Sequence, residues 1–193
     1  MTGVSLGGNP LPTLRWQVMS VGTETALDRE ISALTSITGS GVSSELVIRA
    51  QPSDNGATYK CEASNTATIR PLSTSIKLSV YYVTESVTIQ MSPKYPKSGQ
   101  LLSFVCSSGP CNPMCDLFWY KNNIEIDGQY EEISEMKTPF GGINIRNRLQ
   151  LNVTKRDDES LVVCKAFNQL INKWMASNLT LRVFCKSFLL LIH

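Results

Sequence analysis

The sequence predicts an all-β protein built as two tandem β-sandwiches, and three observations support this prediction. An internal repeat relates the two halves of the 193-residue chain at one constant offset. Short segments alternate apolar and polar residues, which is the pattern of a strand with one buried face. Turn-forming residues separate these segments, and no stretch has a sustained helical period. Short strands with regular turns are typical of two antiparallel sheets packed face to face.

The internal repeat keeps one register from end to end. Trp16 matches Trp119 and Cys61 matches Cys164, both at an offset of 103 residues. Further matched pairs are Asn9 with Asn112, Pro10 with Pro113, Leu14 with Leu117, Leu46 with Leu149, Asp54 with Asp157, Ala63 with Ala166, and Asn65 with Asn168. Because a period near 100 residues is the size of a whole domain, it indicates a duplicated domain rather than a solenoid.

Individual strands are predicted from their alternation. In the first copy these are residues 45–50 (ELVIRA) and 75–80 (SIKLSV), and in the second 148–153 (RLQLNV) and 178–183 (NLTLRV). Turns are expected at Gly39–Gly41, Asn122–Asn123 and Gly141–Gly142.

Composition excludes several classes of function. The net charge is +2 and no block of Lys or Arg stands out, so neither nucleic-acid nor membrane-surface binding is expected. The one histidine is His193, the last residue, which argues against imidazole catalysis or a histidine-ligated metal. The sequence has no Ser/His/Asp set and no phosphate loop, and we expect no enzyme, no cofactor, no metal and no small-molecule substrate.

The cysteines and glycosylation motifs indicate an extracellular setting. The chain has six cysteines and two N-glycosylation acceptors, Asn152 and Asn178, each followed by Thr two positions later. No signal peptide is visible at Met1, and the apolar run 188–192 is too short to span a bilayer. We therefore expect a fragment of a larger, membrane-anchored glycoprotein of the cell surface.

Both copies resemble the immunoglobulin superfamily, in its tandem I-set or C2-like form, over residues 1 to about 183. The residues that carry the resemblance are Trp16, Asp54, Gly56, Tyr59 and Cys61, followed by Cys106, Trp119, Asp157 and Cys164. The segment GGNPLPTLRW looks like the passage from strand B to strand C of adhesion-type members. The segments CNPMCDLFWYKNN and LVVCKAFN are similar to nephrin-type cell-adhesion domains.

This resemblance implies a division into domains and a core disulfide. It gives an incomplete immunoglobulin-like domain at 1–82, a complete one at 83–184 and a tail at 185–193, with a short, stiff junction at Tyr81–Val83. In the complete domain, Cys106 and Cys164 are expected to bond across the core beside Trp119. The first copy has Gly3 where the partner of Cys61 should lie and lacks its first strand, so truncation is expected, with Cys61 a buried thiol.

The stretch DNGATYKC of the first copy is interpreted as a structural corner. The resemblance implies that Tyr59, two residues before Cys61, bonds back to an upstream backbone group. Asp54 and Gly56 would supply the turn that enters the strand. The second copy departs from this pattern, because Val162 replaces the tyrosine and Glu159 replaces the glycine.

The function implied by the resemblance is cell adhesion or recognition through protein contact at a cell junction. The partner would be another immunoglobulin-type surface protein, bound homophilically or heterophilically, and in such families the sheet of strands C, F and G often makes the contact. Alternatives are an immune or growth-factor receptor ectodomain, or a structural matrix protein. An intracellular muscle-filament array is disfavoured by the glycosylation motifs and the extra cysteines.

Further features leave alternatives open. Cys111 and Cys115 bracket a loop before Trp119, and could form a local disulfide, remain thiols, bond another molecule or bind a metal, with the local disulfide favoured. Trp174, placed between strands F and G, could anchor a partner, although local packing of the hairpin is favoured. The acidic run Glu131–Glu135 is expected to be a solvated strand edge rather than a calcium site. Cys185 begins an apolar tail that could be the start of a linker, although an unnatural or incomplete end is favoured.

Overall fold

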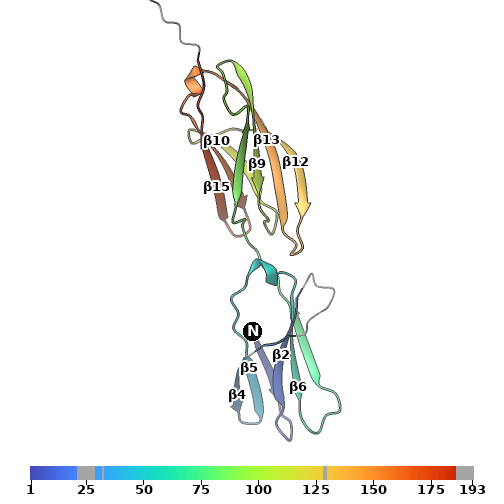
Figure 1. Cartoon of the computed structure of the whole chain (residues 1–193). Helices are drawn as coiled ribbons and strands as arrows, with labels where there is room; N and C mark the ends of the chain where they lie inside the picture. The colour runs from blue at the N-terminus through green and yellow to red at the C-terminus, as the bar shows by residue number, and fades with distance from the viewer. Residues whose placement is uncertain (21–28, 32, 128–129, 186–193) are drawn as a thin grey trace, which may run out of the picture. The chain divides into compact units, whose positions relative to one another are not determined.

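A computed structural model gives the structure of the chain and describes residues 1–20, 29–31, 33–127 and 130–185. The tail at 186–193 lies outside the described residues. The chain forms two compact units, unit one built on Met1–Val80 and unit two on Tyr81–Thr138 with the chain from Gly142 onward. Each unit consists of two antiparallel sheets with no α-helix among the described residues (Figure 1). The predicted all-β class is confirmed, whereas the predicted limits 82 and 184 and the stiff junction stay predictions.

Unit two packs two four-stranded sheets against each other. One sheet has the order β12-β13-β9-β8, formed by Tyr130–Lys137, Ile143–Val153, Gln100–Ser108 and Val87–Ser92. The other has the order β11-β10-β14-β15, formed by Ile124–Glu125, Asp116–Lys121, Leu161–Asn168 and Lys173–Thr180. Alternate residues of β9, β10 and β14 are buried, because one face of each strand lies on the core.

Unit one repeats this plan with one strand fewer among its described residues. One sheet has the order β1-β5-β4, formed by Thr2–Leu6, Gly41–Glu45 and Leu34–Thr38. The other has the order β3-β2-β6-β7, formed by Arg29–Ile31, Thr13–Met19, Thr58–Ser64 and Leu72–Lys77. Short 3₁₀ helices precede the strands that carry Cys61 and Cys164, at Pro52–Asp54 (η1) and Lys155–Asp157 (η2).

Some predicted strand limits are wrong. The segment 45–50 is not a strand, because β5 ends at Glu45. The strand that pairs with β5 is β1, which begins at Thr2. The last backbone hydrogen bonds between the two strands join Met1 and Leu46. Alternation persists there only in the side chains, because Leu46 is buried and Val47 is exposed.

The strands predicted at 75–80 and 178–183 end early, at Lys77 and Thr180. The next residues, Leu78 and Leu181, bond instead to the turns that enter β6 and β14. Those turns contain matched residues in the left-handed region, Gly56 at φ 81° and Glu159 at φ 64°. The turn therefore keeps its shape in the second copy although a glutamate has taken the place of the glycine.

Candidate interaction surface

A disulfide and a tryptophan occupy the centre of unit two. Cys106 on β9 and Cys164 on β14 are joined across the two sheets, with Cα atoms 6.3 Å apart. Trp119 is fully buried, and its ring centroid lies 6.1 Å from that of Phe104. This bridge holds β14 and, through the ladder, β10 and β15 to the opposite sheet, so it fixes the layer that carries the candidate surface.

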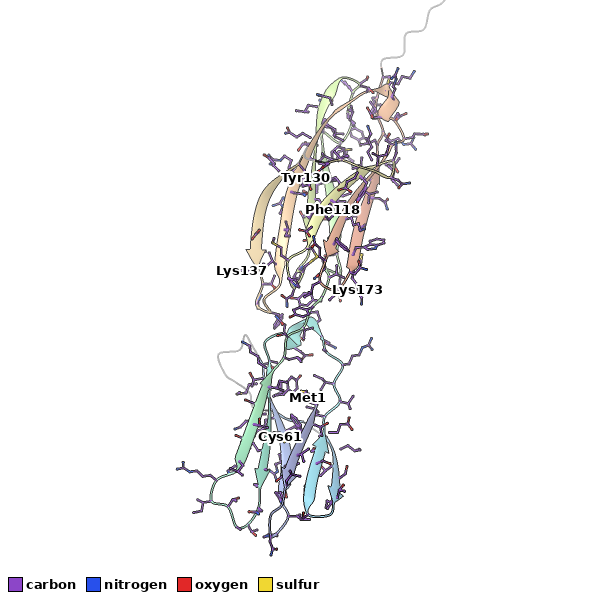
Figure 2. All side chains as sticks on the ribbon, turned by 180° about the vertical axis from the view of Figure 1, so that it is seen from behind. Met1, Cys61, Phe118, Tyr130, Lys137 and Lys173 are labelled. Atoms are coloured by element: carbon purple, nitrogen blue, oxygen red, sulfur yellow. A yellow bond between two sulfur atoms is a disulfide. The ribbon has the colours of Figure 1, made fainter. Side chains whose placement is uncertain are left out.

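Unit one has the same centre without the bridge. Trp16, Tyr59 and Cys61 are buried, and Cys61 forms no disulfide (Figure 2). A Cβ atom placed on Gly3 would lie 2.5 Å from Sγ of Cys61. Position 3 is therefore the place from which a bridge partner would reach Cys61. Burial, and next the charge of Glu62, raises the pKa of the Cys61 thiol, so it stays protonated at neutral pH.

The two buried indoles have matched hydrogen-bond partners that sequence reasoning missed. Trp119 Nε1 donates to Asn147 Oδ1 at 3.0 Å, and Trp16 Nε1 donates to Ser44 Oγ at 3.2 Å. Asn147 and Ser44 are themselves buried and lie at the repeat offset from each other. Each lies two residues before a buried leucine, Leu149 or Leu46, and so belongs to the same inward-facing set of alternating positions. A polar residue at such an inward position was the feature of the sequence that could have predicted these hydrogen bonds.

An asparagine that is matched between the two copies, Asn65 or Asn168, hydrogen-bonds the backbone of a loop that contains proline; we call this contact the asparagine clamp. In unit two, the fully buried Asn168 donates through Nδ2 to the carbonyl oxygens of Tyr82, Asn112 and Pro113, at 3.0, 3.2 and 3.1 Å. In unit one, Asn65 Nδ2 donates to the carbonyl of Pro10 at 2.9 Å. The matched Asn in both copies is thus explained by a side chain that satisfies loop carbonyls.

The outer face of β10, β14 and β15 is the surface that these cores support. Pairing aligns its half-buried or exposed residues in three rows across the strands. The rows are Asp116, Phe167 and Trp174; then Phe118, Lys165 and Ala176; then Tyr120, Val163 and Asn178. Apolar and aromatic side chains therefore gather on one face of a sheet.

One end of this face is an aromatic patch, which we define as Phe118, Lys165, Phe167 and Trp174 (Phe118 and the neighbouring Lys173 are labelled in Figure 2). The Lys165 ammonium lies 5.3 Å from the ring centroid of Phe167 and 5.0 Å from that of Trp174. Trp174 is 58% exposed. Such cation–π contacts hold the indole in place on the surface, and a pre-positioned aromatic side chain is a good anchor for a partner.

The placement of Trp174 differs from the prediction. Trp174 lies in strand β15 and not in the loop before it, because the chain turns earlier, over residues 169–172. Asn172 adopts φ 50°, which allows this tight return.

A shallow hollow of about 520 Å³ adjoins the aromatic patch. It is lined by Pro113, Met114, Asp116, Gln169 and Leu170. Two of these lining residues are bonded to each other, since Gln169 Nε2 donates to Asp116 Oδ2 at 2.9 Å. Asp116 stands in the same row as Phe167 and Trp174, so the hollow and the patch form one continuous surface.

The loop that bears Met114 is closed by a second disulfide. Cys111 and Cys115 are bonded to each other, and both are buried. Of the alternatives considered for this pair, the structure has the local bond. Met114 between them is 40% exposed, so the bridge presents an apolar side chain at the edge of the surface.

The other end of the face is less suited to apolar contact. Asn178, one of the two glycosylation acceptors, is exposed there in the row of Tyr120 and Val163. Burial raises the pKa of Tyr120, and the negative charge of Glu125 and a hydrogen bond to its carboxylate raise that pKa further. The Tyr120 hydroxyl is therefore neutral at physiological pH. Asn152, the other acceptor, is exposed on β13 in the opposite sheet.

Other predicted features lie away from this face. The acidic run is part of β12, an edge strand, where Glu131 pairs with Arg148 at 2.9 Å. Within the described part of the chain, no group of three or more His, Cys, Asp or Glu residues could hold a metal ion. Cys185 is exposed and, like Cys61, unbridged. The described residues contain no helix long and apolar enough to cross a membrane.

Comparison with known proteins agrees with this geometry. Residues 83–173 match the model of the CD80-like C2-set immunoglobulin domain. Most of unit two is therefore an immunoglobulin domain of the C2 set. The predicted resemblance is thereby confirmed, and the matched region covers most of the strands of unit two.

The chain is similar in sequence to nephrin. It is 31% identical to human nephrin over an alignment of 185 residues, and the match covers 93% of this chain and 14% of nephrin. It is 28% identical to rat nephrin over an alignment of 180 residues, and the match covers 90% of this chain and 14% of that protein. The chain therefore spans 14% of the length of these relatives.

Solved structures share the fold of this chain. The D1-D2 structure of Rst is 16% identical, with a TM-score of 0.55, and the match covers 96% of this chain and 92% of that one. The full ectodomain (Ig1–Ig3) of mouse nectin-like molecule 4 is 19% identical, with a TM-score of 0.52 and coverage of 98% and 60%. At such identities the likeness shows the fold alone.

Proposed function

We propose that this chain is an extracellular adhesion or recognition module that binds another immunoglobulin-type surface protein. The aromatic patch of unit two, with the hollow beside it, is the contact surface. The observation that carries the proposal is the exposed Trp174, held by Lys165 on a sheet face fixed by the Cys106–Cys164 bridge. The similarity to nephrin supports the adhesion role. The surface lies on β10, β14 and β15, which correspond to strands C, F and G, the sheet that often makes the contact in such families.

The setting that we propose is the cell surface, as part of a larger membrane-anchored glycoprotein. Two disulfides and two exposed glycosylation acceptors support it. We expect a single contact between two such modules to be weak, and multiple copies on facing cells would supply avidity. The mechanism is protein contact, without a chemical step.

Beads coated with the chain test this proposal. They are mixed with each other and with beads that carry the human nephrin ectodomain as an immunoglobulin-type probe. We expect aggregation in at least one mixture, and Trp174→Ala should reduce it about tenfold or more, as expected for an anchor residue. Met136→Ala is the matched control, because Met136 is an exposed apolar residue on β12 of the other sheet.

Two outcomes would contradict the proposal. One is the absence of aggregation in both mixtures. The other is an equal loss of aggregation in Trp174→Ala and Met136→Ala, which would place the contact elsewhere. Aggregation among identical beads indicates homophilic binding, and aggregation with the probe alone indicates heterophilic binding.

A further inference from the structure

A pocket opens between the two sheets of unit two, beside the two-residue strand β11. This strand pairs only with Tyr120 and Lys121 at the end of β10. Among the described residues, the stretch 116–118 of β10 therefore has no strand next to it on that side. The uncovered edge of β10 is the place where the space between the sheets can be reached from outside.

This inter-sheet pocket has a volume of about 310 Å³ and largely apolar walls. Strand β10 contributes Leu117 and Phe118, β13 contributes Ile145, and β12 contributes Tyr130 (Phe118 and Tyr130 are labelled in Figure 2). Ligand sites in proteins start at roughly 300 Å³, so the pocket has room for one large side chain. Walls of this kind favour an aromatic ring over a flexible polar chain.

The inter-sheet pocket is also lined by a buried carboxamide, that of Asn147, which is 3% exposed. Its Oδ1 accepts the indole N–H of Trp119, and because an indole nitrogen can only donate, Nδ2 is turned away from Trp119. Among the described residues, Nδ2 has no hydrogen-bond acceptor, and it retains accessible surface. It is therefore a donor that a side chain entering the pocket can meet.

Three carboxylates lie around the inter-sheet pocket. Asp116 is one of its lining residues, and Glu125 and Asp127 are exposed. Burial raises the pKa of Tyr130, and the charges of Asp127, Glu125 and Asp116 raise it further, so all three lie within electrostatic reach of the Tyr130 hydroxyl. A negative potential of this kind disfavours an anionic ligand and favours a positive charge beside the entrance.

Together these features select one kind of side chain. The walls favour a ring, Asn147 Nδ2 requires an acceptor at the inner end of the ligand, and the carboxylates disfavour an acidic acceptor. Tyrosine combines a ring with a neutral hydroxyl that accepts a hydrogen bond. Phenylalanine has no acceptor, tryptophan offers only an N–H donor, and glutamine has an acceptor without a ring.

We propose that the inter-sheet pocket receives a tyrosine side chain of the partner protein, with a basic residue next to that tyrosine. The tyrosine hydroxyl accepts a hydrogen bond from Asn147 Nδ2, and the basic residue lies near Asp116. Met114, Asp116 and Gln169 line both this pocket and the shallow hollow, so the pocket continues the proposed contact surface. The inference rests on the proposed function and adds the chemistry of the partner.

The first test is an NMR titration of the full, isotope-labelled chain with the peptide acetyl-Gly-Tyr-Arg-Gly-amide. We expect a saturable change in the indole N–H signal of Trp119, because the acceptor of that N–H is Asn147. The same peptide with phenylalanine in place of tyrosine should bind about tenfold more weakly, since it lacks the hydroxyl. A peptide with glutamate in place of arginine should also bind more weakly. Equal binding of the tyrosine and phenylalanine peptides would overturn the inference.

Two variants test the roles of single residues. Asn147→Ser removes Nδ2 and keeps an acceptor for the indole, as Ser44 does for Trp16 in unit one. In this variant the preference for tyrosine over phenylalanine should be lost. Asp116→Asn keeps an acceptor for Gln169 and should reduce the preference for arginine over glutamate. A full preference for tyrosine in Asn147→Ser would contradict the role of Nδ2, and if that variant does not fold, the peptide pair on the unchanged chain decides.

Competition in the bead assay separates this inference from the proposed function. In a mixture that aggregates, an excess of the tyrosine peptide should inhibit aggregation, and the phenylalanine peptide should require a concentration about tenfold higher. Aggregation that the tyrosine peptide leaves unchanged would overturn the inference and leave the proposed function standing. If no mixture aggregates, the proposed function is contradicted, and the NMR titration still decides whether the pocket selects tyrosine.

Discussion

At the residue scale, the buried indole of Trp119 depends on one carboxamide. Its Nε1 donates to Asn147 Oδ1, and both residues are buried. A buried donor without a partner costs about 1–3 kcal/mol. We expect Asn147→Leu to lower the free energy of unfolding of unit two by that amount, measured by urea titration of Trp fluorescence. Ser44→Ala is the corresponding change in unit one, and a loss below the error of measurement in both variants would contradict the role of these bonds.

Asp157 is a second residue whose partners distinguish the two units. Its Oδ1 lies 2.6 Å from Lys121 Nζ, and its Oδ2 accepts from the backbone and the hydroxyl of Thr154. Burial acts to raise the pKa of this carboxyl, but the hydrogen bonds and the charge of Lys121 outweigh it and lower the pKa below its ordinary 3.8. In unit one, Val18 stands at the position of Lys121, so Asp54 has no such lysine.

We therefore expect Asp157→Asn to destabilise unit two by about 1–2 kcal/mol at pH 7, since it removes a charged acceptor. Because the folded pKa is lowered, this contribution is complete above 3.8 and is lost as the pH falls through the folded value. Urea unfolding at pH 7 and pH 3, followed by hydrogen exchange in peptides of each unit, measures the effect. Asp54→Asn is the matched control and should lower the free energy of unfolding of unit one by less. Equal losses in the two variants would show that Lys121 does not contribute to stability.

At the scale of the element, β1 carries a glycine where β9 carries a bridging cysteine. The Cβ atom built on Gly3 lies 2.5 Å from Sγ and 3.3 Å from Cβ of Cys61. Bridged cysteines have Cβ atoms about 3.5–4.5 Å apart, so a shift of a few tenths of an ångström suffices to form a bond.

Gly3→Cys should thus give unit one a disulfide with the sequence separation of 58 that Cys106–Cys164 has. In the chain-entropy model a loop of this length adds up to about 4 kcal/mol. Thermal unfolding under oxidising and reducing conditions measures the gain, and thiol titration should leave Cys185 alone reactive. Gly3→Ala is the control and should destabilise, because its methyl group meets the sulfur. If the introduced thiol and Cys61 both stay free in oxidising buffer, the geometry inferred for this pair is wrong.

Sequence patterns predicted elements better than their limits. The repeat and the alternation of apolar and polar residues, as in β14, predicted the positions of most strands. They did so because a strand with one buried face needs apolar side chains at every second position. The limits of 45–50, 75–80 and 178–183 were wrong because a strand also needs a pairing partner, and side-chain alternation continues where pairing stops. The position of Trp174 on β15 depended on a tight turn at Asn172 that composition alone did not mark.

The candidate surface was harder to predict than the fold. Trp174 lies on β15 and reaches Lys165 and Phe167 of β14 only when the two strands pair in one register. Met114 joins them through the Cys111–Cys115 bond, one of several alternatives that spacing left open. By contrast, the inward parity of Asn147 and Ser44 was visible in the sequence, and a search for polar residues at core positions would have found both.

At the scale of the whole molecule, glycosylation would divide the interaction face. A glycan on Asn178 would cover the row of Tyr120 and Val163 and leave the aromatic patch open, since Trp174 lies two rows away on the same strand. Expression through a secretory pathway should give a mass that falls on glycosidase treatment, with part of the fall removed by Asn178→Gln. Bead aggregation should be kept or increased in Asn178→Gln, and its loss would show that the glycan itself takes part in the contact.

The Asn168 clamp has a practical consequence for producing unit two by itself. The side-chain amide of Asn168 donates a hydrogen bond to the carbonyl of Tyr82. The backbone of Tyr82 also exchanges two hydrogen bonds, of 2.8 and 3.0 Å, with the backbone of Asn112. A recombinant domain cut before Val83 would discard these anchors, although the matched family region begins there. A domain that starts at Tyr81 should have a higher melting temperature than one that starts at Val83. Calorimetry on the two proteins would show whether Tyr81 and Tyr82 are part of the folded domain.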